Sequence, residues 1–311
     1  MIIAAKTAID IKQIEDRKNR GANYLELHTI PEYFDGSRED VDFAKEYKNL
    51  LKEYGMQCIC VHSPIKNSYK QGCGVGYYGK VADEKYLNNM FLLKESLVFA
   101  EKVLTGDRRL CVVHVPESFT FANIESMEKE KEYFMKDVLE LSKFAKENAP
   151  HVVIAIENTI KAIDKKRGLS HKAVYGYKEE FVRWVEELNL ENVGVMIDVC
   201  HALATANYRR SLGRKDFLEL EDYFRAYKKK LLHIHLSNSY NFGFEEDHGE
   251  SYKENERDIS ILKKIDSLIS EIGYKGNITI ETVDKSVYAY ERYTETVNVI
   301  KNHGIFKGGI F

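Results

Sequence analysis

The sequence predicts an α/β fold, a single (β/α)8 TIM barrel with a metal site at the C-terminal face of its strands. Short apolar runs rich in Val, Ile and Leu alternate along the chain with longer charged segments of helical periodicity. Near-continuous apolar strands separated by helices are typical of a parallel sheet that helices cover on the outside. A count of about eight such units indicates that the sheet closes on itself.

The expected elements follow one another regularly. The expected strands cover residues 2–6, 23–28, 57–62, 110–115, 152–157, 193–198, 231–236 and 277–282. The expected helices lie near residues 9–19, 38–54, 83–105, 127–148, 178–188, 215–229, 257–272 and 286–302. Gly21, Gly55 and Gly273 each follow a helical pattern shortly before a strand, where a left-handed C-cap is expected. No Pro/Gly/Ser-rich linker divides the chain, so we expect one domain over residues 1–311.

Composition narrows the classes of function. Hydrophobic residues make up 44% of the 311 residues, enough for a buried core, and the net charge of −3 argues against nucleic acid as a partner. No apolar run approaches the ~18 residues that span a membrane. The first residues lack the pattern of a signal peptide, and five cysteines show no paired spacing. We therefore expect a cytoplasmic protein without a membrane partner, and a homo-oligomer is compatible with the sequence.

Side chains of metal-binding type stand at the ends of the expected strands three to eight. They are His62, His114, Glu157, Asp198, His235 and Glu281. His201 follows Asp198 by three residues, a spacing that can place both on one side of a turn. A histidine that ends one strand has an ordinary structural explanation, but coincidence is a poor explanation for the whole set. Because all strand ends meet on one face of a closed barrel, the sequence predicts a metal centre there.

The types of ligand limit which metal ion the site can bind. Imidazoles together with carboxylates favour Zn²⁺, Mn²⁺ or Co²⁺ over Mg²⁺ or Ca²⁺. The candidate ligands outnumber those that one ion needs. The sequence is therefore compatible with one to three bound ions, with Glu157 or another carboxylate as a bridge between them. We expect His233 to lie one step deeper than His235 on the same inward face, as a hydrogen-bonded interior residue. Glu26 and His28 are expected to line the pocket.

These strand ends resemble those of the xylose isomerase-like TIM barrels, a superfamily that joins sugar isomerases and epimerases to endonuclease IV-type apurinic endonucleases. The resemblance covers about residues 20–300 and rests on the segments VHSP, VVHVP, AIENT, IDVCHA, HIHLSN and ITIETVD. It implies metal roles for His62, His114, Glu157, Asp198, His201, His235 and Glu281. After the seventh strand the nucleases carry Asp-x-His and a glycine-rich turn. Here the nearest match is Glu246 and His248, with Asp247 as a competing carboxylate, and the turn is missing.

Two enzymatic functions follow as hypotheses. The leading one is a metal-dependent sugar or sugar-phosphate isomerase or epimerase, in which Glu157 and Glu281 form the acid/base pair for proton transfer. Arg209 and Arg210, in a basic loop expected after strand six, are candidates to bind a substrate phosphate. The alternative is a metal-dependent phosphoesterase of the apurinic endonuclease type, which the full histidine set favours. The segment HTIPEYFDGSRED counts against it, because it lacks the Arg- and aromatic-rich stretch of the nucleases. A barrel that binds metal or sugar without catalysis is a third option.

Overall fold

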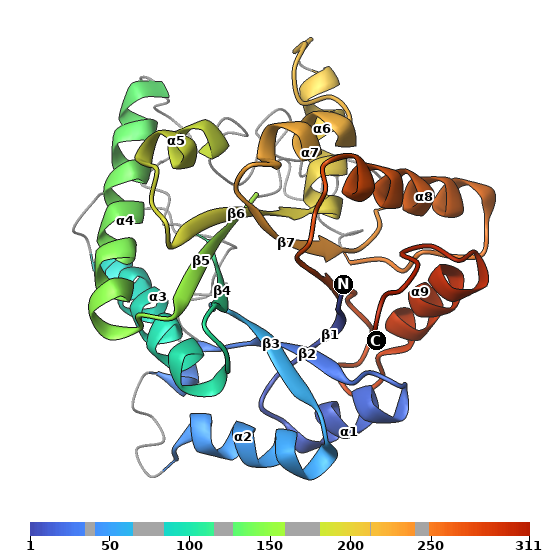
Figure 1. Cartoon of the computed structure of the whole chain (residues 1–311), viewed down its shortest axis with the longest axis horizontal. Helices are drawn as coiled ribbons and strands as arrows, with labels where there is room; N and C mark the ends of the chain where they lie inside the picture. Colours follow the sequence, from blue (N-terminus) through green and yellow to red (C-terminus); the bar gives the residue numbers. More distant parts are fainter. Residues whose placement is uncertain (35–40, 65–83, 115–126, 159–180, 212, 240–248) are drawn as a thin grey trace.

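The strands form a closed barrel. The computed structural model describes residues 1–34, 41–64, 84–114, 127–158, 181–211, 213–239 and 249–311. Parallel strands pair in chain order, and the last one closes onto the first (Figure 1). They are β1 (Ile3–Thr7), β2 (Tyr24–His28), β3 (Gln57–His62), β4 (Arg109–Val113), β5 (Val152–Glu157), β6 (Val193–Asp198), β7 (Leu231–Leu236) and β8 (Asn277–Ile280). The expected TIM barrel is therefore confirmed.

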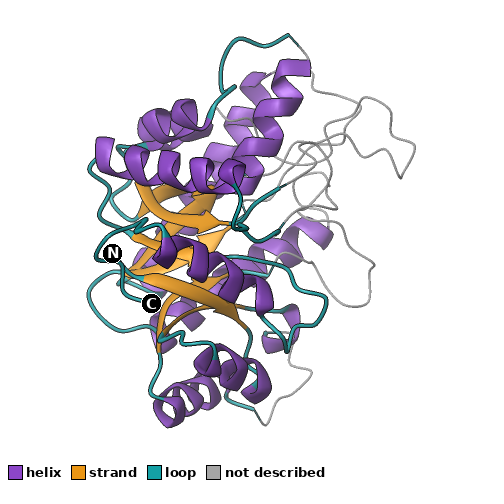
Figure 2. Ribbon diagram, turned by 90° about the vertical axis from the view of Figure 1, so that its right-hand side faces the viewer, coloured by secondary structure: helices purple, strands orange, loops and turns teal. Residues whose placement is uncertain are grey.

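The helices lie outside the strands, as Figures 1 and 2 show. Within the described residues they are α1 (Ile11–Asn19), η1 (Pro31–Tyr33, a 3₁₀ helix), α2 (Phe43–Tyr54), α3 (Glu84–Val103), α4 (Met127–Asn148), α5 (Phe181–Leu188), α6 (Val199–Ser211), α7 (Leu220–Tyr227), α8 (Glu256–Glu271) and α9 (Glu291–Asn302). Helix α6 was not expected, because its sequence VCHALATANYRRS has no clear apolar stripe. Among the described helices, none combines the length and apolarity of a membrane span.

Local signals set both ends of α2, which begins at Phe43 rather than near residue 38, and its glycine C-cap was expected. The side chain of Asp42 accepts a hydrogen bond from the backbone N–H of Lys45 and so caps the start of α2. Gly55 ends the same helix in the left-handed conformation, with a φ of 60°. Because Gly has no Cβ, this reversal costs little, and β3 begins two residues later.

Among the described residues, the apolar core includes two clusters. The larger one lies between the outer face of the barrel and the helices, and includes Leu25, Ile154 and Ile234. The smaller one fills part of the barrel interior, and its buried members are Cys60, Val112, Ala155 and Met196. Successive residues of a strand point to opposite faces, so the residue two positions later on each strand also points inward. Those later positions carry the predicted metal ligands.

Candidate metal centre

Seven predicted ligands lie together at the C-terminal ends of the strands, and all are buried. They are His62, His114, Glu157, Asp198, His201, His235 and Glu281. Their strands are parallel, so residues far apart in the sequence meet at one end of the barrel. Strand register contributes directly, because His235 on β7 pairs with Asp198 on β6.

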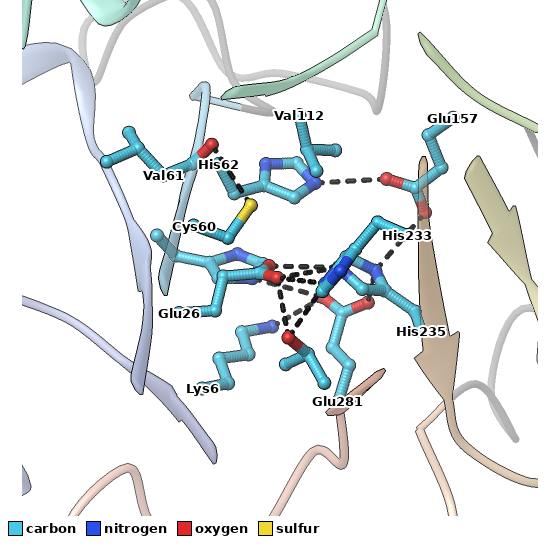
Figure 3. Close-up of polar contacts among 12 residues, drawn as sticks. Lys6, Glu26, Cys60, Val61, His62, Val112, Glu157, His233, His235 and Glu281 are labelled. Carbon is cyan, nitrogen blue, oxygen red and sulfur yellow. Dashed lines mark hydrogen bonds and ion pairs between the residues drawn. The ribbon is translucent and has the colours of Figure 1, made fainter. Parts of the chain in front are cut away.

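Four of these residues form the main group. Glu157, Asp198, His235 and Glu281 each offer one ligand atom, and these atoms lie within 4.8 Å of one another. His235 is central to the group. Its Nδ1 atom lies 2.7 Å from Glu281 Oε2, 3.7 Å from Glu157 Oε1 and 3.9 Å from Asp198 Oδ2. Figure 3 shows Glu157 and Glu281 on different sides of His235.

A second group shares Glu157 with the first. The Nε2 atoms of His62 and His114 lie 3.0 Å and 2.9 Å from Glu157 Oε2. His62 is oriented from its other side, where Nδ1 donates to the backbone carbonyl of Ser63 at 2.7 Å. The other carboxylate oxygen of Glu157 faces the main group, so this side chain can bridge two ions.

Asn158 fixes the positions of Asp198 and His201. Its side-chain Oδ1 accepts from the backbone N–H of Asp198 at 2.6 Å, and its Nδ2 donates to the Asp198 carbonyl at 3.1 Å. The backbone carbonyl of Asn158 accepts from His201 Nδ1 at 2.7 Å. Any ligation by His201 is therefore through Nε2. Sequence reasoning missed Asn158, although it follows Glu157 directly in AIENT.

Lys6 is a second residue that sequence reasoning missed. Its Nζ atom lies 2.9 Å from Glu281 Oε1, and its side chain is partly buried. Lys6 stands near the end of β1, so the rule that found the other residues applies to it too. A lysine at a strand end is not a usual metal ligand, so its residue type gave no signal of a site.

The electrostatics of the main group show that it needs positive charge. Burial raises the pKa of Asp198 to about 6, and Glu157 and Glu281 act in the same direction while His201 opposes them. Burial would lower the pKa of His235, but Glu26, Glu281 and Glu157 outweigh it and raise that pKa well above its ordinary value. Without a cation, these carboxylates therefore favour a proton on His235.

The pKa values of the two proposed catalytic carboxylates are lowered. Burial works to raise both, but His114 and His235 hold the pKa of Glu157 well below its ordinary value. Lys6 and His235 do the same for Glu281. Both carboxylates are thus ionised at neutral pH, the form in which they bind a cation or accept a proton.

The donors fit a divalent ion. Nitrogen and carboxylate oxygen are the donors that Zn²⁺, Mn²⁺ and Co²⁺ accept together. Among the described residues, the buried Nδ1 atom of His235 makes no hydrogen bond of acceptable geometry, although Glu281 Oε2 lies 2.7 Å away. The buried Nδ1 atom of His114 likewise has no hydrogen-bond partner within the part of the chain that the structure describes. A cation among the acids of the main group would give His235 Nδ1 the partner that it lacks.

The other predicted site residues are Glu246 or Asp247, His248, Arg209 and Arg210. Glu246, Asp247 and His248 are outside the described residues. Arg209 and Arg210 do not lie in a loop as expected but in the last turn of α6, which the sequence analysis missed. Arg209 pairs with Asp216 at 2.6 Å, and Arg210 pairs with Glu219 at 2.9 Å. These contacts tie α6 to the segment before α7, and a role in substrate binding stays a prediction.

This chain resembles known proteins in its sequence pattern and in its fold. The family model described as xylose isomerase-like TIM barrel matches residues 14–303. Among curated proteins, none matches the chain in sequence. Three similar solved structures illustrate the range of relatives. They are the 3-keto-D-glucoside 4-epimerase of E. coli (15% identity, 97% of this chain and 99% of that chain covered, TM-score 0.62), an AP endonuclease, family 2, of Brucella melitensis (15%, 98% and 98%, 0.61) and the IolI protein with a bound zinc atom (18%, 99% and 100%, 0.61). At these identities the likeness shows the fold alone.

Proposed function

The chain belongs to the xylose isomerase-like TIM barrel family, and from this premise we propose that it is a metal-dependent sugar or sugar-phosphate isomerase or epimerase. The observation that carries the proposal is the main group, in which Glu157, Asp198, His235 and Glu281 bring one ligand atom each within 4.8 Å of the others. A 3-keto-D-glucoside 4-epimerase and a D-tagatose 3-epimerase-like protein among the similar structures support the same class.

These four residues would hold the ion. A bound divalent cation would supply positive charge beside the oxygens of a keto- or hydroxy-sugar and so acidify the neighbouring C–H. Asp198 and His235 are best placed as fixed ligands, because Asn158 holds the backbone of Asp198 and Glu26 holds the imidazole of His235. Their side chains therefore keep one orientation while substrate binds and leaves.

Glu157 and Glu281 would move the proton. Glu157 is the last residue of β5, and Glu281 directly follows β8. The two side chains therefore reach the centre from separate parts of the barrel. One carboxylate removes the proton from the carbon beside the carbonyl, and the other delivers a proton after taking one up. Burial of both groups excludes bulk water from the proton path, so the proton exchanges with solvent only through these side chains.

Solvent-exchange measurements test this proposal. The protein loaded with Mn²⁺ or Co²⁺ is incubated with ketose substrates in deuterated water, and deuterium in the sugar C–H is followed by NMR. We expect exchange in the native protein and its loss in Glu281→Gln and Glu157→Gln. His151→Gln is a matched control. His151 is exposed, lies just before β5 and forms an ion pair with Glu101. Exchange that survives both Glu substitutions would contradict the assigned roles.

A phosphoesterase of the apurinic endonuclease type is the second candidate, and one observation favours it. His62 and His114 form their own group with Glu157, which suits a second ion bridged by this carboxylate. Two ions can activate water and neutralise a phosphate in the same site. An AP endonuclease, family 2, is also among the similar structures.

Nicking of a duplex that contains an abasic site separates the candidates. Under the alternative, nicking occurs with Zn²⁺, Mn²⁺ or Co²⁺ and disappears in the double variant His62→Gln/His114→Gln, with loss of one bound ion per chain. Absence of nicking with all three ions would rule out the alternative. Under the leading proposal, the same double variant keeps the ion of the main group, because neither histidine belongs to that group.

A further inference from the structure

A polar sector lies beneath part of the metal centre, inside the barrel. The residues two positions before the ligands on β3 to β6 are the small apolar cluster of Cys60, Val112, Ala155 and Met196. The corresponding positions on β2, β7 and β8 carry Glu26, His233 and Thr279 instead. All three are fully buried. Polar groups in a barrel interior are costly unless they are paired, so this change of character on neighbouring strands calls for a function.

Glu26 is the centre of this sector, and its carboxylate is surrounded by donors. His233 Nε2 and Thr279 Oγ1 lie 2.9 Å and 2.7 Å from its Oε2 atom. His28 Nε2 lies 2.9 Å from its Oε1 atom. His235 Nε2 lies within reach of both oxygens, at 2.9 Å and 3.1 Å (Figure 3). The contact with His235 links this interior carboxylate directly to a proposed metal ligand.

The two nitrogens of His235 therefore face different partners. Nε2 lies 2.9 Å and 3.1 Å from the two oxygens of the Glu26 carboxylate, which accept its hydrogen bond, so Nε2 carries a proton. Nδ1 faces the other way, towards Glu281, Glu157 and Asp198. A neutral imidazole with its proton on Nε2 has its lone pair on Nδ1, which is the atom that a metal needs.

We propose that Glu26 is a positioning residue that holds His235 with its proton on Nε2 and its Nδ1 lone pair directed at the metal centre. This inference rests on the proposed function, because it assumes that His235 binds an ion. Thr279 supports the arrangement by donating to Glu26 Oε2, which fixes the rotation of the carboxylate. Carboxylates that orient metal-bound histidines in this way typically contribute 10–100-fold to metal affinity.

A second cation in this sector is the competing explanation, since Glu26, His28 and His235 also bring ligand atoms within 4.8 Å of one another. The positive charge already present argues against it. The Lys6 ammonium pairs with Glu281 Oε1, and that oxygen lies 3.6 Å from His28 Nε2. A cation bound by His28 would share Glu281 with this ammonium, so two positive charges would compete for the same carboxylate.

Metal affinity of the full-length protein tests the proposal. The dissociation constant for Zn²⁺ alone is measured by competition with a chelator in the native protein, in Glu26→Gln and in the control His233→Gln. His233 contacts Glu26 at 2.9 Å, the same distance as His235, but His233 does not belong to the main group. We expect Zn²⁺ binding to weaken about 10–100-fold in Glu26→Gln and less than about threefold in His233→Gln.

NMR of the zinc-loaded native protein, with isotope-labelled histidine, reads the proton position directly. We expect His235 to carry its proton on Nε2 and to bind zinc through Nδ1. Zinc on Nε2, or equal affinity in Glu26→Gln, overturns the inference while the metal centre stands. A native protein that binds no Zn²⁺ overturns the metal centre and this inference with it. If Glu26→Gln does not fold, the NMR result on the native protein decides alone.

Discussion

Lys6 Nζ lies 2.9 Å from Glu281 Oε1, across the seam where β1 closes onto β8. The pair places a fixed positive charge beside a carboxylate that is also a candidate metal ligand and proton carrier. The ammonium stabilises the ionised form of Glu281, which leaves the other oxygen, Oε2, directed at His235. The Glu281 carboxylate thus contacts Lys6 of β1 with one oxygen and His235 of the metal centre with the other.

Lys6→Gln should shift the acid limb of the pH–activity profile to higher pH. Lys6 is the first of the groups that lower the pKa of Glu281, so its removal raises that pKa and protonates the carboxylate at a higher pH. The profile of proton exchange against pH measures the shift. Lys12→Gln is the control, because Lys12 is exposed on α1. An unchanged acid limb would show that Glu281 does not limit the rate.

Metal binding should weaken as the pH falls below about 6. Asp198 has a pKa raised to about 6, so below that value it carries a proton, which the ion must displace. Above that value Asp198 is ionised, and the proton that still competes is the one on His235, whose pKa is raised well above its ordinary value. Displacement of one proton costs about tenfold in affinity for each pH unit. Zn²⁺ titrations between pH 5 and 7, read against a chelator, check the slope, and a flat profile would contradict the prediction.

Asp198→Asn should reduce the affinity for Zn²⁺ by more than about 100-fold, which exceeds the loss expected for a residue that only orients a ligand. The amide keeps the size of the side chain and its acceptor for the His201 N–H, but removes the charge that binds the ion. Elemental analysis after dialysis gives the number of ions per chain. His151→Gln should retain the native number, since His151 lies before β5, at the opposite ends of the strands.

Asn158→Ala should lower the free energy of unfolding by about 2–5 kcal/mol, because it leaves the buried N–H and C=O of Asp198 without their side-chain partner. Urea denaturation of the metal-free protein measures the loss. Asn148→Ala is a matched control: Asn148 is exposed and donates to the Phe144 carbonyl, so we expect a change of less than about 0.5 kcal/mol. Equal losses in the two variants would refute the bracing role of Asn158.

The sequence was sufficient for the barrel and for the main group. Apolar strands alternate clearly with helices, and the strand ends of a closed barrel must converge, so Glu157, Asp198, His235 and Glu281 could be grouped before any coordinates. Each of these residues carries a ligand atom, which makes it visible to a search by residue type.

The surrounding residues were harder to predict, for different physical reasons. Lys6 and Asn158 act on the ligands through an ion pair and through backbone hydrogen bonds, and neither kind of contact has a sequence spacing of its own. Glu26 was expected to line the pocket, but its hydrogen bond to His235 depends on strands that are distant in sequence. The loop expected around Arg209 was wrong, because α6 is buried on several sides and so lacks an apolar stripe.

The two oxygens of Glu157 face different imidazoles, Oε2 towards His62 and His114 and Oε1 towards His235. A charge that neutralises one oxygen withdraws electron density from the other. Occupancy on one side would therefore change the affinity on the other, and thermodynamic reciprocity requires both effects to be equal in magnitude. If both positions fill, the second ion would bind more weakly than the first, and the two sites would not be independent.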